Sequence, residues 1–73
     1  MFAVKYKEIG LKIAYYRKRR GLTQAELADM IGKSTNYIGS IERGNNGASY
    51  SMQTLFSIAD ALNVNPEDLL KEI

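Results

Sequence analysis

The segment QAELADMIGKSTNYIGSIER, residues 24–43, decides the fold of this 73-residue chain. It contains a short amphipathic helix, a glycine turn and a second helix, with small or apolar residues where two crossing helices must touch. Ala28 lies where the first helix is expected to be crossed most closely, and Gly32 lies where the chain reverses. Ile38 and Ile41 are expected to face the core from the second helix. The spacing therefore predicts two helices joined by a tight turn.

The opposite face of the second helix carries three short, polar, uncharged side chains: Thr35, Asn36 and Ser40. Such a face suits a surface that is dense in hydrogen-bonding groups, and the major groove of DNA is such a surface. The alternative is an ordinary solvated helix face. The position of these residues between two helix caps favours the groove.

The sequence before this segment predicts a helix over residues 6–20, with an apolar stripe formed by Ile9, Ile13 and Tyr16. Gly10 within this helix lowers its intrinsic stability and therefore marks a close contact with another helix. Thr23 and Glu26 form a capping box at the start of the next helix, and Ser34 caps the helix after it.

Two further helices are predicted after the loop 45–50. Ser51 caps the first of them, and its expected inner face consists of Met52, Leu55, Ile58, Ala59 and Leu62. Asn65 and Pro66 begin the last helix, which continues to the end of the sequence. The fold class is therefore all-α, a five-helix bundle in one domain, 1–73, with a helix-turn-helix unit at 23–43. Residues 1–5 alternate in polarity and are predicted as an extended arm that packs on the domain.

Composition excludes several classes of function. The chain has no cysteine and no histidine, so we expect no metal site, no cofactor and no enzymatic activity. The net charge is only +2, but residues 5–20 carry seven basic and one acidic side chain, whereas residues 21–73 carry three and seven. This uneven distribution of charge favours a polyanionic partner. The alternative is that the basic residues belong to a solvated helix end, where positive charges suit the helix dipole. No apolar segment is long enough for a membrane span, and we expect a cytoplasmic protein.

In these residues the chain resembles the helix-turn-helix domains of phage repressors and Cro proteins. The resemblance covers about residues 9–70 and rests on LTQAELA at 22–28, the Gly32 turn and YIGSIERG at 37–44. It implies a lambda-repressor-like bundle that binds operator DNA as a homodimer. Such a domain is non-enzymatic and inserts its third helix into the major groove.

The resemblance also implies roles for individual residues. Base readout is assigned to Thr35, Asn36 and Ser40, and contacts to the DNA backbone are assigned to Gln24, Lys33, Ser34, Tyr37, Arg43, Asn45 and Asn46. Arg17 and Glu42 match an ion pair that bridges the first and third helices. Family members often carry a longer side chain at the position of Ser40. Here the helix either lies unusually deep in the groove or depends on DNA shape and water for specificity.

A symmetric dimer needs an exposed surface, and the C-terminal third offers the most apolar side chains. The candidate dimerisation residues are Leu62, Val64, Leu69, Leu70 and Ile73, and the N-terminal arm is the second choice. The leading hypothesis is a repressor that binds a near-palindromic operator. An antitoxin or a restriction–modification controller would use the same module. The rival from another class is a protein-interaction module that has lost DNA binding, but acidic or bulky apolar residues at 35, 36 and 40 would be expected in that case.

Overall fold

The computed structural model describes residues 2–44 and 50–71, and within them the chain forms five α-helices and no strands. The helices are α1 (Ala3–Arg19), α2 (Gln24–Ile31), α3 (Thr35–Arg43), α4 (Met52–Leu62) and α5 (Pro66–Leu70). The predicted all-α, five-helix fold is thereby confirmed. None of the helices in this described part has the length and apolar character needed to cross a lipid bilayer.

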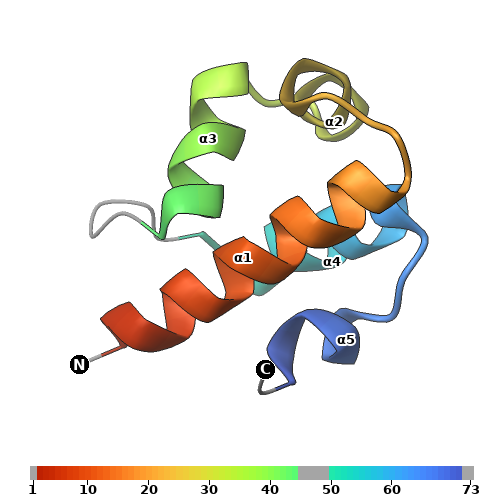
Figure 1. Ribbon diagram of the computed structural model, residues 1–73. Coiled ribbons are helices and arrows are strands. Elements are labelled where there is room, and N and C mark those ends of the chain that lie inside the picture. Colours follow the sequence, from red (N-terminus) through yellow and green to blue (C-terminus); the bar gives the residue numbers. More distant parts are fainter. Residues whose placement is uncertain (1, 45–49, 72–73) are drawn as a thin grey trace.

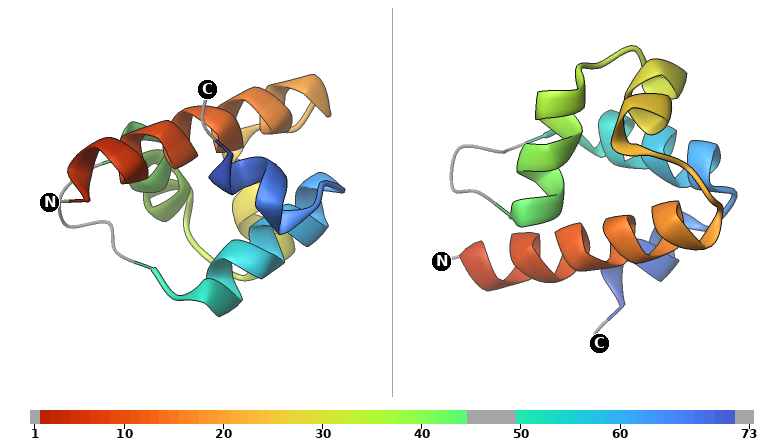
Figure 2. Two further views of the ribbon diagram at one scale, coloured as in Figure 1. Left: turned by 90° about the horizontal axis from the view of Figure 1, so that it is seen from below. Right: turned by 45° about the horizontal axis from the view of Figure 1, so that its top comes forward.

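Helix α1 runs along the molecule, with α2 and α3 on one side of it and α5 on the other (Figure 1 and Figure 2). It contacts α3, α4 and α5, whereas α2 packs against α3 and α4. The helix-turn-helix unit is therefore supported from two directions, by α1 beneath α3 and by α4 beneath α2. This arrangement leaves the outer side of α3 uncovered.

Side-chain caps begin the three middle helices, as the sequence predicts. Thr23 Oγ1 accepts a hydrogen bond from the Glu26 amide at 3.0 Å, and a Glu26 carboxylate oxygen accepts one from the Thr23 amide at 2.8 Å. Ser34 and Ser51 each accept a hydrogen bond at 3.1 Å from the amide three residues further on. These bonds satisfy amide groups that have no partner within the helix.

One apolar core joins all five helices. Its buried members are Ile13, Leu27, Ala28, Ile38, Ile41, Leu55, Ile58, Ala59, Ala61, Leu62 and Leu69. The prediction for α4 is right except at Met52, whose side chain is 55% exposed. Met52 is the first residue of α4. Its side chain lines a surface groove, so it does not belong to the inner face.

The predicted extended arm is wrong for residues 3–5, because Ala3 already begins α1. The alternation of polarity there is only a few residues long, and nothing in it prevents helix formation. Tyr6 packs edge to face against Tyr50, with ring centroids 5.6 Å apart, and this contact fixes the first turns of α1 to the segment before α4. Phe2 supplies no side-chain cap.

The C-terminal residues assigned to a dimer surface have different environments. Leu62 and Leu69 are 3% and 0% exposed, so their assignment to the surface is wrong: both complete the core. Val64 is partly buried against that core, whereas Leu70 is 49% exposed. Leu69 and Leu70 lie about 100° apart around the axis of the short helix α5, so its docking buries the first and leaves the second exposed. Ile73 lies outside the described residues.

Helices α1 and α3 cross at two glycines. A Cβ atom on Gly10 would lie only 2.4 Å from the carbonyl oxygen of Ile41 and 2.7 Å from that of Glu42. At Gly44, a Cβ atom would lie 2.6 Å from Lys7 Cα. The backbones of the two helices are therefore in direct contact, which is the close approach predicted from Gly10.

This crossing predicts that Gly10→Ala destabilises the fold. Alanine would favour the helix by up to about 1 kcal/mol. However, the new methyl group meets backbone atoms that cannot move aside, so the cost of overpacking should lie at or above the upper end of the usual range of roughly 1–3 kcal/mol. We expect the midpoint of thermal unfolding to fall by at least about 4 °C. Leu11→Ala, at an exposed position of the same helix, is the control. Equal stability of Gly10→Ala and the wild type would contradict the predicted contact.

Candidate nucleic-acid interface

The turn between α2 and α3 sets which face of α3 points outward. Gly32 ends α2 with φ +68°, a left-handed conformation that side chains disfavour. Ile38 and Ile41 are buried, which fixes the rotation of α3. As a result, Thr35 and Asn36 are exposed and Ser40 is partly exposed. The structure therefore brings the three predicted base-reading residues onto one outward-facing surface.

The N-terminal end of α3 offers a site for an anion. Lys33 and Ser34 are both exposed there, beside amide groups and the positive end of the helix dipole. The Lys33 ammonium lies 5.3 Å from the centroid of the half-buried Tyr37 ring. This cation–π contact holds the positive charge close to the helix end. Asn45 and Asn46, the remaining predicted backbone contacts in the loop after α3, lie outside the described residues.

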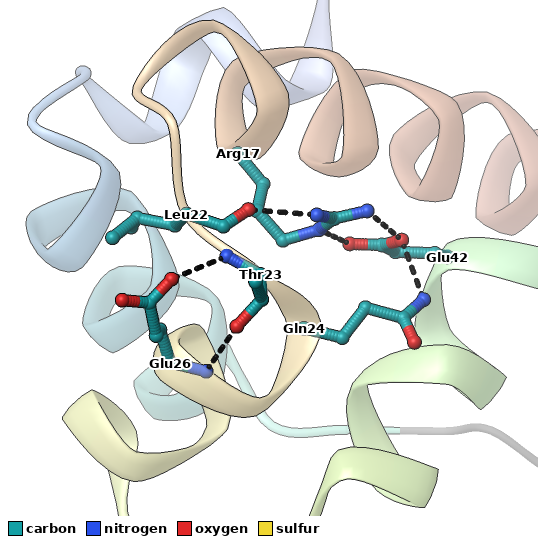
Figure 3. Close-up of polar contacts among 6 residues, drawn as sticks. All are labelled: Arg17, Leu22, Thr23, Gln24, Glu26 and Glu42. Atoms are coloured by element: carbon teal, nitrogen blue, oxygen red, sulfur yellow. Dashed lines mark hydrogen bonds and ion pairs between the residues drawn. The ribbon is translucent and has the colours of Figure 1, made fainter.

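A buried ion pair joins α1 to the end of α3, as the resemblance implies. Arg17 Nε lies 2.6 Å from one carboxylate oxygen of Glu42, and Arg17 Nη2 lies 3.1 Å from the other (Figure 3). The third nitrogen of Arg17 donates to the carbonyl oxygen of Leu22 at 2.8 Å. The two side chains are only 9% and 7% exposed. The planar guanidinium thus satisfies two segments of the chain at once.

Gln24 belongs to the same network, a contact that sequence analysis missed. Its Nε2 donates to a Glu42 carboxylate oxygen at 3.0 Å (Figure 3). The amide thus joins the first residue of α2 to the last turn of α3. The spacing of Gln24 and Glu42 contains no signal for this bond, because the contact depends on how α2 and α3 cross. Gln24 therefore has a positioning role within the protein besides any contact with DNA.

Arg43 lies back along α3 toward the base-reading face. A Cβ atom on Gly39 would be 3.2 Å from Arg43 Nη1, and Arg43 Nη2 lies 3.5 Å from Ser40 Oγ. Arg43 itself is exposed. The sequence does place Gly39 and Ser40 four and three residues before Arg43, where they share a helix face with it. That spacing is the signal that could have indicated this arrangement.

The basic residues of α1 are largely engaged within the protein. Arg17 is in the buried pair, Arg19 donates to the Tyr15 hydroxyl at 3.3 Å, and Arg20 donates to the carbonyl oxygen of Ala61. Lys12 donates to the carbonyl oxygen of Lys71. The contacts of Lys12, Arg17 and Arg20 therefore link α1 and its C-terminal end to other elements of the fold, whereas the contact between Arg19 and Tyr15 lies within α1.

The comparison with protein families agrees with this geometry. The family model of the helix-turn-helix domain HTH_3 matches residues 13–69, which span α2, the turn, α3 and α4 together with the C-terminal part of α1 and most of α5. The chain therefore belongs to the HTH_3 family of helix-turn-helix domains, the Cro/C1 type.

Two relatives place the chain within this family. SinR of Bacillus subtilis, an HTH-type transcriptional regulator, is 39% identical over 64 residues, which are 88% of this chain and 57% of SinR. The competence pilus inhibition repressor of Acinetobacter baylyi is 41% identical over 56 residues, 77% of this chain and 49% of that protein. The chain thus spans about half the length of these two relatives.

Solved structures show the same fold. The restriction–modification controller protein C.AhdI of Aeromonas hydrophila superposes with a TM-score of 0.85 at 28% identity, covering 93% of this chain and 96% of that one. SinR in complex with DNA superposes with a TM-score of 0.77 at 38% identity, covering 86% and 98% of the two chains.

The buried pair predicts that losing one partner is worse than losing both. Arg17→Met leaves the Glu42 carboxylate buried with only Gln24 as a partner, and we expect the free energy of unfolding to fall by roughly 3–5 kcal/mol. Arg17→Met/Glu42→Leu should recover part of this loss, because no uncompensated charge remains. Urea unfolding of Arg17→Met, of Glu42→Leu and of the double variant measures the coupling between the two side chains.

Arg19→Met is the matched control, since its guanidinium is exposed and should contribute less than about 1 kcal/mol. A double variant whose loss equals the sum of the two single losses would show that Arg17 and Glu42 are not coupled.

Proposed function

We propose that this chain is a sequence-specific DNA-binding module of a transcriptional regulator, and that it acts as a repressor by occupying an operator. Three properties of the relatives support the proposal: SinR is a transcriptional regulator, it has been solved with DNA, and the Acinetobacter protein is a repressor. The likeness to C.AhdI favours a second candidate, control of a restriction–modification system, which would use the same DNA contacts. No catalytic step is part of either function.

The observation that carries the proposal is the outer face of α3. Thr35 and Asn36 are exposed on a helix whose orientation is fixed by a buried ion pair and by two crossing glycines. Asparagine can form two hydrogen bonds with an adenine edge, and the threonine methyl group can contact the methyl group of thymine. A face that is short, polar and rigidly held suits base readout better than it suits a protein partner.

Contacts to the DNA backbone would come from the beginning of each helix of the unit. Lys33 and Ser34 flank the N-terminus of α3, and the half-buried Tyr37 can reach a phosphate with its hydroxyl group. Gln24 begins α2, where helix amides favour an anion. These contacts would fix the position of α3 in the groove without reading sequence.

We further propose that two copies bind a near-palindrome. One α3 helix reads only a few base pairs, and a two-fold pair would place two such helices about 34–36 Å apart, one turn of DNA. The surface available for a second copy is an apolar groove between the start of α1, the start of α4 and α5. Its rim carries Phe2, Met52 and Leu70, which are 64%, 55% and 49% exposed.

Tyr50 lies in this groove and shows how apolar it is. Within the described residues its buried hydroxyl has no hydrogen-bond partner, and burial, with smaller contributions from Tyr6 and Tyr37, raises the pKa of Tyr50 to about 12. Phe56, one turn beyond Met52 on α4, is 50% exposed and extends the apolar surface. A second copy seated here would cover side chains that are otherwise in water, although so small a surface supports only a weak dimer.

If Asn36 reads a base, Asn36→Ala should relax the preference at one base pair of each half-site. The expected loss there is roughly 1–3 kcal/mol, with little change at other positions. Lys33→Ala, the backbone control, should weaken binding to every duplex alike and reduce the salt dependence. Selection of bound sites from random duplexes measures both effects. A uniform loss from Asn36→Ala would remove its assignment as a reader.

The dimer proposal predicts that Leu70→Lys weakens self-association and cooperative operator binding by at least about tenfold. A lysine in this groove would bring a charge into an apolar interface, where an unpaired charge is strongly disfavoured. Leu11→Lys is the matched control, because Leu11 is similarly exposed (55%) and lies outside the groove. Sedimentation velocity and band-shift stoichiometry provide the measurements. Tight binding of one protomer to an asymmetric site, unchanged by Leu70→Lys, would contradict the dimer.

A further inference from the structure

None of the three residues assigned to the base-reading face of α3 has a long side chain. Thr35, Asn36 and Ser40 are all short, and Gly39 contributes no side chain. Arg43, however, lies on the same stripe of the helix as Asn36 and Ser40, which precede it by seven and three residues. It is the last residue of α3 and is exposed. Arg43 is therefore the one long side chain with access to this face in the described part of α3.

The direction of Arg43 is set by its neighbours on α3. Its Nη2 lies 3.5 Å from Ser40 Oγ, and its Nη1 lies over the backbone of Gly39. No carboxylate of the described residues forms an ion pair with it. Among the described residues the only hydrogen-bond partner of its side chain is Ser40, so further donors of the guanidinium are available, and the group points along α3 toward the reading face.

Gly39 explains why the guanidinium can take this position. It lies inside α3 and is not among the glycines with positive φ, so its backbone conformation does not require glycine. Alanine there would favour the helix. The missing side chain leaves space instead: a Cβ atom would be 3.2 Å from Arg43 Nη1 and 3.8 Å from Gln24 Oε1.

We infer that Arg43 is a specificity-determining residue that reads a guanine in each half-site, and that Gly39 is its positioning residue. This inference rests on the proposed function as a DNA-binding module. The guanidinium can donate two hydrogen bonds to O6 and N7 of guanine, and this pairing is the commonest specific contact in the major groove. Arg43 thereby supplies the long side chain that Ser40 does not. This role as a base reader replaces the contact to the DNA backbone that the resemblance implies for Arg43.

Selection of bound sites from random duplexes tests the inference with the full chain. The wild type should select a guanine at one position of each half-site. Arg43→Gln should reduce that preference about ten- to a hundredfold and leave the other positions unchanged. Arg43→Lys keeps the charge but loses the planar fork, so it should retain most affinity for random DNA and lose most of the discrimination.

Gly39→Ala tests the positioning role with Arg43 still present. We expect a smaller loss of preference at the same base pair, with thermal stability equal to or above that of the wild type. A preference unaffected by Gly39→Ala would remove the positioning role. A uniform loss on all duplexes from Arg43→Gln, with every base preference intact, would show a phosphate contact and overturn the inference while leaving the proposed function in place. A wild type that selects no sequence at all would refute the proposed function itself.

Discussion

The position of α3 depends on one carboxylate. Glu42 receives hydrogen bonds from Arg17 on α1 and Gln24 on α2, and Arg17 also holds the carbonyl oxygen of Leu22 in the connection between those helices. A buried charge is tolerated only when its partners are complete, so each of these segments must take its place for the others to be stable. The network lies where the end of α3 meets α1 and α2, and it fixes the orientation of the exposed residues of α3. An interface that must fit the fixed edges of base pairs benefits from such rigidity.

Much of this fold could be predicted from the sequence because its signals are local. The caps at Thr23, Ser34 and Ser51 act on amides three residues away, and the buried residues of α2, α3 and α4 follow helical spacing. The Gly10 contact was also predictable, since a glycine inside a helix weakens that helix and so indicates that another backbone passes close by. The outward positions of Thr35 and Asn36 follow from the inward positions of Ile38 and Ile41.

What the sequence could not predict depends on how distant elements pack. Leu69 and Leu70 are identical in type, and only the docking of α5 decides that the first is buried and the second is exposed. Gln24 resembles a phosphate contact in sequence, but the crossing of α2 and α3 brings it to Glu42. Residues 3–5 have no strong local preference, and the packing of Tyr6 on Tyr50 favours their helical state. The roles of the reading residues toward DNA stay predictions.

The separation of Arg17 and Glu42 along the chain has a kinetic consequence. The pair joins residues 25 positions apart, whereas each cap joins residues three positions apart. Closing the longer loop costs more chain entropy. The ion pair offsets this cost only once α2 and α3 are both in place. We therefore expect the capped helices to form early and the ion pair to form after the main barrier to folding. An interaction that is absent from the transition state slows unfolding and leaves the folding rate nearly unchanged. On this account, the network that orients α3 also governs how long the domain stays folded once it has formed.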